Sequence, residues 1–380
     1  MKKYISILLL MLALLYSACA EGAEEYAFNA DDYAVTAYYG MGSEVVLPNE
    51  IDGCPVEILE SSVFYANSEV TSLTLPDTLL SLGSSNVYFM EQLTSVQLPQ
   101  SLVAIDDYNF YSCPLLESVV IPSGVSYIGE HSFYSCENLK EICFEGEVPV
   151  IAPECFQFLA EGAVARVPQD QVEAYRAALP AELEVVSSGV DAVKRDFTAP
   201  ESDFSFDAAT GTITAYNGFG VRVDIPKTIG GTAVRAIGEN AFYGHQYMYC
   251  VRIPEGVETI GAEAFSGTYH LAAASLPSTL REIGDSAFAQ YKGQIIQLPE
   301  GLKAIGHRAF YWSQLQEAYF PEGIASIGEE AFAGSYINYL CLGLHAAGDC
   351  GKRIRRTLYQ RCGSELARQQ GTDACCAGVL

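Results

Sequence analysis

The sequence lacks the residue patterns that most enzymes need at their active sites. The five histidines are scattered, and no two of them have the H-x-x-x-H or H-E-x-x-H spacing of a zinc site. The phosphate loop G-x-x-x-x-G-K-[ST], the nucleophile elbow G-x-S-x-G and the C-x-x-C pair are all missing. Because no acid, base and nucleophile stand out together, we expect no catalytic residues, no metal site and no cofactor.

Basic residues are also scarce, since 21 Lys and Arg stand against 47 Asp and Glu, for a formal net charge of −26. Nucleic acids and anionic membrane surfaces attract basic proteins, so this charge disfavours both as partners and leaves basic partners open. The adjacent carboxylates Asp31-Asp32 and Asp106-Asp107 are far from a calcium coordination shell. We interpret them as solvated surface residues.

No apolar run after the N-terminus reaches the length of a membrane-spanning helix. At the N-terminus two lysines precede an apolar run over residues 5–15, and Ala18-Cys19-Ala20 fits the small-x-small rule for cleavage. We therefore predict a signal peptide over residues 1–20 and a mature protein that is secreted or on the cell surface, without a transmembrane helix. In an alternative interpretation, Ser17-Ala18-Cys19 looks like the end of a bacterial lipobox, and Cys19 holds a lipid anchor.

The chain is instead filled with copies of one pattern, seen most clearly in residues 116–136 (L-E-S-V-V-I-P-S-G-V-S-Y-I-G-E-H-S-F-Y-S-C). Val119 and Ile121 alternate with outward positions, as in a short half-buried strand. Pro122 ends that strand because proline has no amide proton to donate. Gly129 then permits a tight bend, and Phe133 fills the layer.

Three positions of this pattern recur together along the chain. The strand-ending prolines are 22 or 23 residues apart within two groups, namely Pro76, Pro99 and Pro122, then Pro254, Pro277, Pro299 and Pro321. The layer-filling phenylalanines are Phe64, Phe110, Phe133, Phe242, Phe265, Phe288, Phe310 and Phe332, and an Ile-Gly pair precedes most of them. Such a period indicates stacked units, none of which buries its apolar face alone. We predict a β-rich, leucine-rich-repeat-like solenoid of two tandem arrays with coils of about 22–23 residues and short helices at the caps.

The motif L-x-x-V-x-I-P-x-x-V-x-x-I-G-x-x-A-F resembles the BspA-like leucine-rich repeat of bacterial surface proteins. The best matches are residues 257–265 (V-E-T-I-G-A-E-A-F) and 324–332 (I-A-S-I-G-E-E-A-F), and the resemblance covers roughly residues 45–160 and 212–342. The N/C-x-L of the better-known horseshoe repeats is missing, which favours a compact β-rich coil. The resemblance implies display on a bacterial cell surface and binding of macromolecules of a host or neighbouring cell.

The repeat array is duplicated. Pro48 and Phe64 correspond to Pro226 and Phe242 at the same offset of 178 residues. Each copy begins with an irregular unit, as expected of a cap over an exposed core. We therefore divide the mature chain into a first array over residues 24–186, a polar linker over 187–207, a second array over 208–342 and a C-terminal tail or cap over 343–380.

Two segments outside the coils are predicted to be helical. Residues 170–179 place Val172, Tyr175 and Leu179 on one face, with Asp170 as the N-cap, and we interpret this helix as the closing unit of the first array. In the tail, apolar residues recur every four positions from Ile354 onward, and basic residues outnumber acidic ones. We interpret the tail as a cap, with a basic docking helix as the alternative.

Twelve cysteines in an exported chain raise the question of disulfides. Cys113 and Cys136 stand one period apart, and stacked strands lie close enough for a bridge between them. The matching positions of other coils hold Asn67, His245, Thr268 or Ser313. That mixture of mostly small residues favours two buried, unreactive thiols over a bridge.

One row of side chains has a predicted use. A tyrosine follows the layer phenylalanine, or Val87 in its place, at Tyr65, Tyr88, Tyr111, Tyr134, Tyr243 and Tyr311. Stacked coils would align these rings as stripes, four rings long in the first array. Tyrosine offers a large contact area at low entropic cost, so the stripes are a candidate site for a protein or glycan. The alternative is a ladder that only shields the edge of the coils.

Two functions follow from these patterns. The first is a non-catalytic recognition or adhesion protein, because a repeat solenoid presents an extended surface of equivalent positions to a large partner. The second is an exported structural module, such as an envelope spacer, without a specific ligand.

Overall fold

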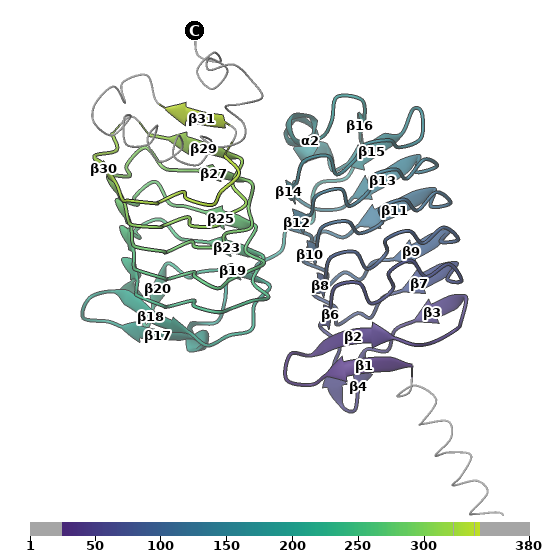
Figure 1. The fold of residues 1–380 in the computed structure, drawn as a ribbon, viewed down its shortest axis with the longest axis horizontal. Coiled ribbons are helices and arrows are strands. Elements are labelled where there is room, and N and C mark those ends of the chain that lie inside the picture. The colour runs from purple at the N-terminus through teal and green to yellow at the C-terminus, as the bar shows by residue number, and fades with distance from the viewer. Residues whose placement is uncertain (1–24, 322, 338, 343–380) are drawn as a thin grey trace, which may run out of the picture. The chain divides into compact units, whose positions relative to one another are not determined.

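The computed structural model describes residues 25–321, 323–337 and 339–342. The chain divides into two compact units between Asp196 and Phe197, and we call their described residues array 1 and array 2. In each array the chain winds through similar coils, and the strands of successive coils lie one above another (Figure 1). The predicted β-rich repeat solenoid is confirmed.

Each array contains one seven-stranded sheet, and in array 2 most of its strands end at the isoleucine of an Ile-Gly pair. Its strands in array 1 are β1 (Tyr26–Asn29), β2 (Ala34–Tyr38), β6 (Ile58–Leu59), β8 (Ser81–Leu82), β10 (Ala104–Ile105), β12 (Tyr127–Ile128) and β14 (Val150–Ile151). Those in array 2 are β17 (Phe204–Asp207), β18 (Thr212–Tyr216), β22 (Ala236–Ile237), β24 (Thr259–Ile260), β26 (Glu282–Ile283), β28 (Ala304–Ile305) and β30 (Ser326–Ile327). The first two strands of each sheet form an antiparallel hairpin, and the following pairs are parallel. These hairpins are the irregular first units of the sequence.

A second set of parallel sheets is formed by the other strand of each coil, which in most coils lies just before a repeat proline. In array 1 they are β3 (Glu44–Val46), β7 (Ser72–Thr74) and β9 (Ser95–Gln97), then β11 (Ser118–Ile121), β13 (Glu141–Phe144), β15 (Val164–Val167) and β16 (Glu184–Ser187). In array 2 they are β19 (Arg222–Asp224), β23 (Cys250–Arg252) and β25 (Ala273–Ser275), then β27 (Ile295–Gln297), β29 (Glu317–Phe320) and β31 (Tyr339–Leu342). Small hairpins join β4 (Glu50–Ile51) to β5 (Cys54–Pro55) and β20 (Thr228–Ile229) to β21 (Thr232–Ala233). Val119 and Ile121 are buried while Ser118 and Val120 are exposed, as the alternation predicts.

The layer phenylalanines stack as a column that is continuous in array 2, whereas in array 1 Val87 takes the place of a ring between Phe64 and Phe110. In array 2, Phe242, Phe265, Phe288, Phe310 and Phe332 are buried, and the ring centroids of successive residues lie 4.8–5.4 Å apart. Their planes differ by only 4–19°, so the rings lie nearly parallel. This spacing is close to that of neighbouring strands, which means that the backbone ladder sets the distance between the rings.

The glycine of the Ile-Gly pair serves close stacking and not a left-handed bend. Gly129 does not have a positive φ, but a Cβ built on it would lie 2.4 Å from the backbone nitrogen of Asp107 in the preceding coil. In array 2, a Cβ on Gly261 would lie 2.7 Å from the nitrogen of Glu239. The sequence pattern is therefore right that glycine is needed at this position. The reason is the close approach of the preceding coil, however, and not the tight bend that the sequence suggests.

The closing helix of array 1 begins later than predicted. A 3-10 turn over Gln169–Gln171 (η1) precedes α2 (Val172–Ala178), and no side chain caps the helix. Asp170 does not act as the N-cap, because its Oδ1 accepts a hydrogen bond of 2.8 Å from the Ala192 amide. Tyr175 is buried, and its ring centroid lies 4.8 Å from that of Phe144.

The segment that the sequence assigns to a linker is held against the coils. In array 1, the Val193 amide donates to the Glu145 carbonyl (3.0 Å), and Arg195 Nε donates to Ser123 Oγ (3.1 Å). In array 2, the Ala199 amide donates to the Asp224 carbonyl at 3.0 Å. The short turn η2 (Glu201–Asp203) and strand β17 also come from residues 187–207.

Three predictions lie outside the described residues: the signal peptide over residues 1–20, the lipid anchor at Cys19 and the tail over residues 343–380. Among the residues that the structure does describe, no helix has the length and apolar character to cross a membrane.

Candidate functional site

The four tyrosines of array 1 stack into a ladder along one edge of the coils. The ring centroids of Tyr65 and Tyr88 lie 5.0 Å apart, those of Tyr88 and Tyr111 4.9 Å, and those of Tyr111 and Tyr134 5.1 Å. The interplanar angles are 5–22°. Ring faces inside the ladder are therefore covered by neighbouring rings, and Tyr65 at its end is 53% exposed.

The two tyrosines of array 2 do not form such a ladder. Ser266 and Ala289 occupy the same position in the coils between Tyr243 and Tyr311. Tyr243 is exposed. The guanidinium carbon of Arg308 lies 4.9 Å from the centroid of the Tyr311 ring, so that ring has a cation from its own chain.

Two positions of the turn around each layer phenylalanine adopt the left-handed conformation with positive φ. The first lies two residues before the phenylalanine or its equivalent, at Ser62, Ser85, Tyr108, His131, Glu154, Asn240, Glu263, Ser286, Arg308 and Glu330. The second lies two residues after it, at Ala66, Phe89, Ser112, Ser135, Phe158, Gly244, Gly267, Gln290, Trp312 and Gly334. The coil geometry thus suits glycine or a small residue at the second position.

Three coils place a large aromatic residue at that second position. Phe89, Phe158 and Trp312 have φ of 53–56°, and they are 41%, 62% and 60% exposed, respectively. A bulky side chain in this region costs roughly 1–2 kcal/mol of backbone free energy. Phe89 and Phe158 extend the ladder sideways, because their centroids lie 4.5 Å from Tyr88 and 4.9 Å from Tyr134.

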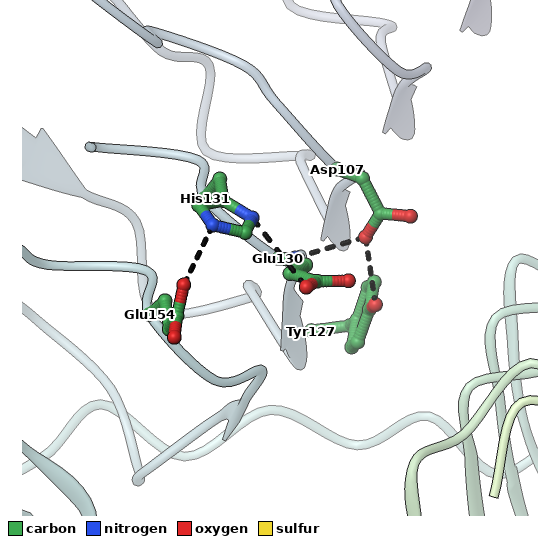
Figure 2. A network of polar contacts seen from close by, with 5 residues as sticks. All are labelled: Asp107, Tyr127, Glu130, His131 and Glu154. Atoms are coloured by element: carbon green, nitrogen blue, oxygen red, sulfur yellow. Dashed lines mark hydrogen bonds and ion pairs between the residues drawn. The ribbon is translucent and has the colours of Figure 1, made fainter. Parts of the chain in front are cut away.

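A polar network borders the ladder at the first left-handed position (Figure 2). His131 Nε2 lies 2.8 Å from Glu154 Oε2, and its Nδ1 lies 3.5 Å from Glu130 Oε1. The Glu130 amide and the Tyr127 hydroxyl both donate to Asp107 Oδ1, at 2.9 and 3.2 Å. The His131 ring also stacks on Tyr108, with centroids 5.2 Å apart and planes 7° apart.

Burial and nearby groups raise the pKa of two tyrosine hydroxyls at this edge, those of Tyr88 and Tyr108. Burial raises the pKa of Tyr88, and the neighbouring Tyr65 and Tyr111 raise it further. Burial also raises the pKa of Tyr108, with added contributions from the carboxylates of Glu130 and Asp107. A neutral phenol both donates and accepts hydrogen bonds, and the raised pKa extends the range of alkaline pH over which Tyr88 and Tyr108 keep this ability.

A buried amide ladder supports the turns behind the tyrosines. Asn86 and Asn109 are fully buried, and Asn109 Oδ1 accepts a hydrogen bond of 3.1 Å from the Asn86 amide. Asn109 Nδ2 donates to the carbonyls of Gly83 (2.9 Å) and Asp106 (2.8 Å). The same position in array 2 holds buried alanines such as Ala287. Array 1 thus fixes its turns with side-chain hydrogen bonds that array 2 does not use.

A surface groove of about 520 Å³ begins where the ladder ends. Its apolar lining includes Phe156, Phe158, Leu159, Pro180 and Leu183, and its acidic lining consists of Glu161 and Glu182. Phe158 belongs to both features, because it lines the groove and contacts Tyr134. The ladder and the groove therefore form one continuous surface, which we call the aromatic edge.

The sequence favours two buried thiols at Cys113 and Cys136 over a bridge between them, and the structure has both cysteines free and buried. Their Sγ atoms donate to the carbonyls of Val87 (3.0 Å) and Phe110 (2.9 Å). Burial raises the pKa of Cys136 to about 12. Within the described ranges, no group of three or more His, Cys, Asp or Glu is placed to hold a metal ion.

Comparison with known protein families identifies the family of this chain. The model of the BspA type leucine-rich repeat region matches residues 54–162 and 233–346, in six copies. These ranges make up more than half of the sequence. The chain belongs to this family. In this BspA-type repeat protein, the matched ranges include the four ladder tyrosines and both amide-ladder asparagines.

Solved structures similar to this BspA-type protein are bacterial leucine-rich repeat proteins. A leucine-rich cell surface protein of Faecalibacterium prausnitzii is 21% identical, with 87% of this chain and 95% of that chain covered and a TM-score of 0.35. The T. pallidum leucine-rich repeat protein is 19% identical, with 71% and 87% covered and a TM-score of 0.31. The pneumococcal vaccine antigen PcpA is 17% identical, with 80% of each chain covered and a TM-score of 0.30. No curated protein matches the chain.

Proposed function

We propose that this BspA-type chain is a non-catalytic recognition or adhesion protein that binds a macromolecular partner through the aromatic edge of array 1. In this proposal residues 1–20 direct export, the mature protein is secreted or displayed on the cell surface, and a lipid on Cys19 is the alternative mode of attachment. Residues 24–186 and 208–342 act as two repeat arrays, and residues 343–380 as a tail or cap.

The observation that supports recognition most strongly is the presence of exposed aromatic residues where the backbone suits glycine. Phe89 and Phe158 each stand in a left-handed turn, although Gly244 and Gly267 occupy this position in array 2. Neither phenylalanine is needed for the central column, which Phe110 and Phe133 fill. Exposed aromatic side chains that oppose the local backbone preference are more readily explained by binding than by folding.

An exported spacer without a specific ligand is the second candidate function. The close stacking of the tyrosine rings favours it, because rings that cover one another also shield the edge of the coils. A spacer, however, requires no exposed aromatic residues beside that ladder. The two functions therefore differ in what happens when Phe89 and Phe158 are removed.

The test is a binding screen of the purified chain against a defined panel of matrix proteins and glycans. We expect saturable binding to one member of the panel, and we expect Phe89→Gly combined with Phe158→Gly to weaken it at least tenfold. Glycine suits the φ of both positions, so the double variant should remain folded by circular dichroism. Trp312→Gly is the matched control in array 2. Absence of saturable binding to any member would favour the spacer.

A further inference from the structure

The aromatic edge of array 1 also has an unusual charge environment. The first array contains no lysine or arginine before Lys140, although acidic residues recur throughout that stretch. Glu130 and Glu154 border the ladder, and Glu161 and Glu182 line the groove. No basic residue lines that groove. The groove therefore combines apolar side chains with two carboxylates and no basic residue, whereas Glu130 and Glu154 beside the ladder both contact His131.

The second array shows how a cation fits at the same position. Arg308 stands two residues before its layer phenylalanine and lies over the Tyr311 ring, while its Nε hydrogen-bonds to Glu330. The equivalent positions in array 1 hold Tyr108 and His131. A carboxylate equivalent to Glu330 is nevertheless present at Glu154. In array 1 His131 takes the place of Arg308, because its Nε2 lies 2.8 Å from Glu154 Oε2 and its ring centroid lies 5.0 Å from that of Tyr134. Array 1 thus keeps the aromatic and acidic parts of this arrangement with a histidine where array 2 has an arginine.

We propose that the aromatic edge binds a lysine- and arginine-bearing polypeptide segment. This inference rests on the proposed recognition function and names the chemical class of the partner. The aliphatic stem of a lysine or arginine would pack on Phe158 and Leu159 in the groove, with its charged end at Glu161 and Glu182. Further basic side chains would meet the tyrosine hydroxyls and the carboxylates of Glu130 and Glu154.

The geometry favours a polypeptide over a glycan. A sugar stacks on the free face of an aromatic ring, whereas the faces of Tyr88 and Tyr111 are covered by rings about 5 Å away. The ladder measures roughly 15 Å, which an extended peptide of about five residues would span. A test peptide of eight residues therefore exceeds the length of the ladder and leaves residues that can enter the groove.

The test uses two labelled peptides and the full-length chain in fluorescence anisotropy at physiological salt. One octapeptide alternates lysine and alanine, and the other replaces each lysine with glutamine. We expect saturable binding of the lysine peptide alone. Glu161→Gln with Glu182→Gln, and separately Phe158→Gly, should each weaken it at least fivefold.

The matched controls change the same charge and the same kind of side chain in array 2. Glu239→Gln with Glu300→Gln removes two exposed carboxylates, and Trp312→Gly removes an exposed aromatic residue at an equivalent turn. Both controls should leave the affinity within twofold. Equal losses in the groove variants and the controls would reduce the interaction to general charge attraction and overturn the proposal.

Other occupants give distinct results. Equal binding of the glutamine peptide, or displacement of the lysine peptide by a neutral oligosaccharide, would overturn the cationic class. A peptide of residues 351–361 that binds tenfold more tightly than the lysine peptide would make the chain's own tail the occupant, which also overturns an external partner. If the panel protein still binds through Phe89 and Phe158 while the lysine peptide does not bind, recognition stands and only this inference fails.

Discussion

Replacement of Phe265 by alanine tests whether the stacked coils form a rigid column. Phe265 is fully buried between Phe242 and Phe288, with centroids 4.8 and 5.1 Å away. Loss of a buried phenylalanine typically costs about 3–5 kcal/mol, and the value depends on how far the neighbours collapse into the cavity. Here the Phe265 amide donates to the Ala287 carbonyl at 2.8 Å, and similar bonds in adjacent coils fix the spacing. We therefore expect a loss of about 4 kcal/mol in the free energy of unfolding.

The assay is urea denaturation followed by tryptophan fluorescence. The sequence contains a single tryptophan, Trp312, and it lies in array 2 with Phe265. Phe265→Leu keeps most of the apolar volume and should lose about half as much, while the exposed Tyr243→Ala should stay within about 0.5 kcal/mol of wild type. A loss below about 1.5 kcal/mol for Phe265→Ala would show that the column is neither rigid nor closely packed.

Three further predictions concern buried polar groups and thiols. Asn109→Ala should destabilise array 1 by about 2–4 kcal/mol in urea denaturation followed by circular dichroism, because the Asn86 amide and two carbonyls lose a buried partner; an unchanged midpoint would contradict the amide ladder. Cys136, whose pKa is raised to about 12 by burial, should be alkylated at pH 8 only after unfolding, as judged by mass spectrometry; rapid labelling of the native chain would be the opposite result. Burial lowers the pKa of His245, so the unfolded state takes up a proton that the folded state does not, and the stability of array 2 should fall as the pH drops through about 6.5. His245→Asn, which copies Asn67 of the first array, should flatten this pH dependence, and an equally steep dependence in the variant would assign it to other groups.

Much of the coil could be predicted from the sequence because stacking fixes the same residue types in every turn. Phe133 stacks on Phe110 and Phe156 in the coils on either side, with centroids 4.9 and 5.3 Å apart, so a defect at one such position affects two interfaces. Because of this repetition, the sequence alone predicts the length of one coil, the position of its strands and the residues that fill each layer. The aligned tyrosines followed from the same reasoning, since Tyr88 and Tyr111 must lie one coil apart.

Other features depend on geometry that the sequence does not display. The left-handed turns at Tyr108 and Phe158 lack the glycine that usually marks a positive φ. Asn86 and Asn109 look like ordinary turn residues until their amides are seen to bridge adjacent coils. Comparison of the two arrays at the glycine position, where Gly244 corresponds to Phe89 and Phe158, is a signal in the sequence that could have added these two residues to the predicted tyrosine stripe.

The same limitation explains the misplaced helix cap. Asp170 stands in a suitable position for capping, but its carboxylate bonds to the Ala192 amide of the segment that returns along array 1. A tertiary contact from a residue 22 positions away therefore replaces a local one. Such contacts have no periodic pattern, and no local propensity predicts them.

The most direct test of recognition by array 1 compares two pairs of tyrosine substitutions. The affinity of the panel partner should fall at least tenfold for Tyr111→Ala with Tyr134→Ala, which interrupts the ladder, as expected when buried aromatic contacts are lost from an interface. Tyr243→Ala with Tyr311→Ala, which removes the unstacked tyrosines of array 2, should leave that affinity within twofold. Wild-type affinity in a correctly folded Tyr111→Ala, Tyr134→Ala variant would contradict recognition through the aromatic edge.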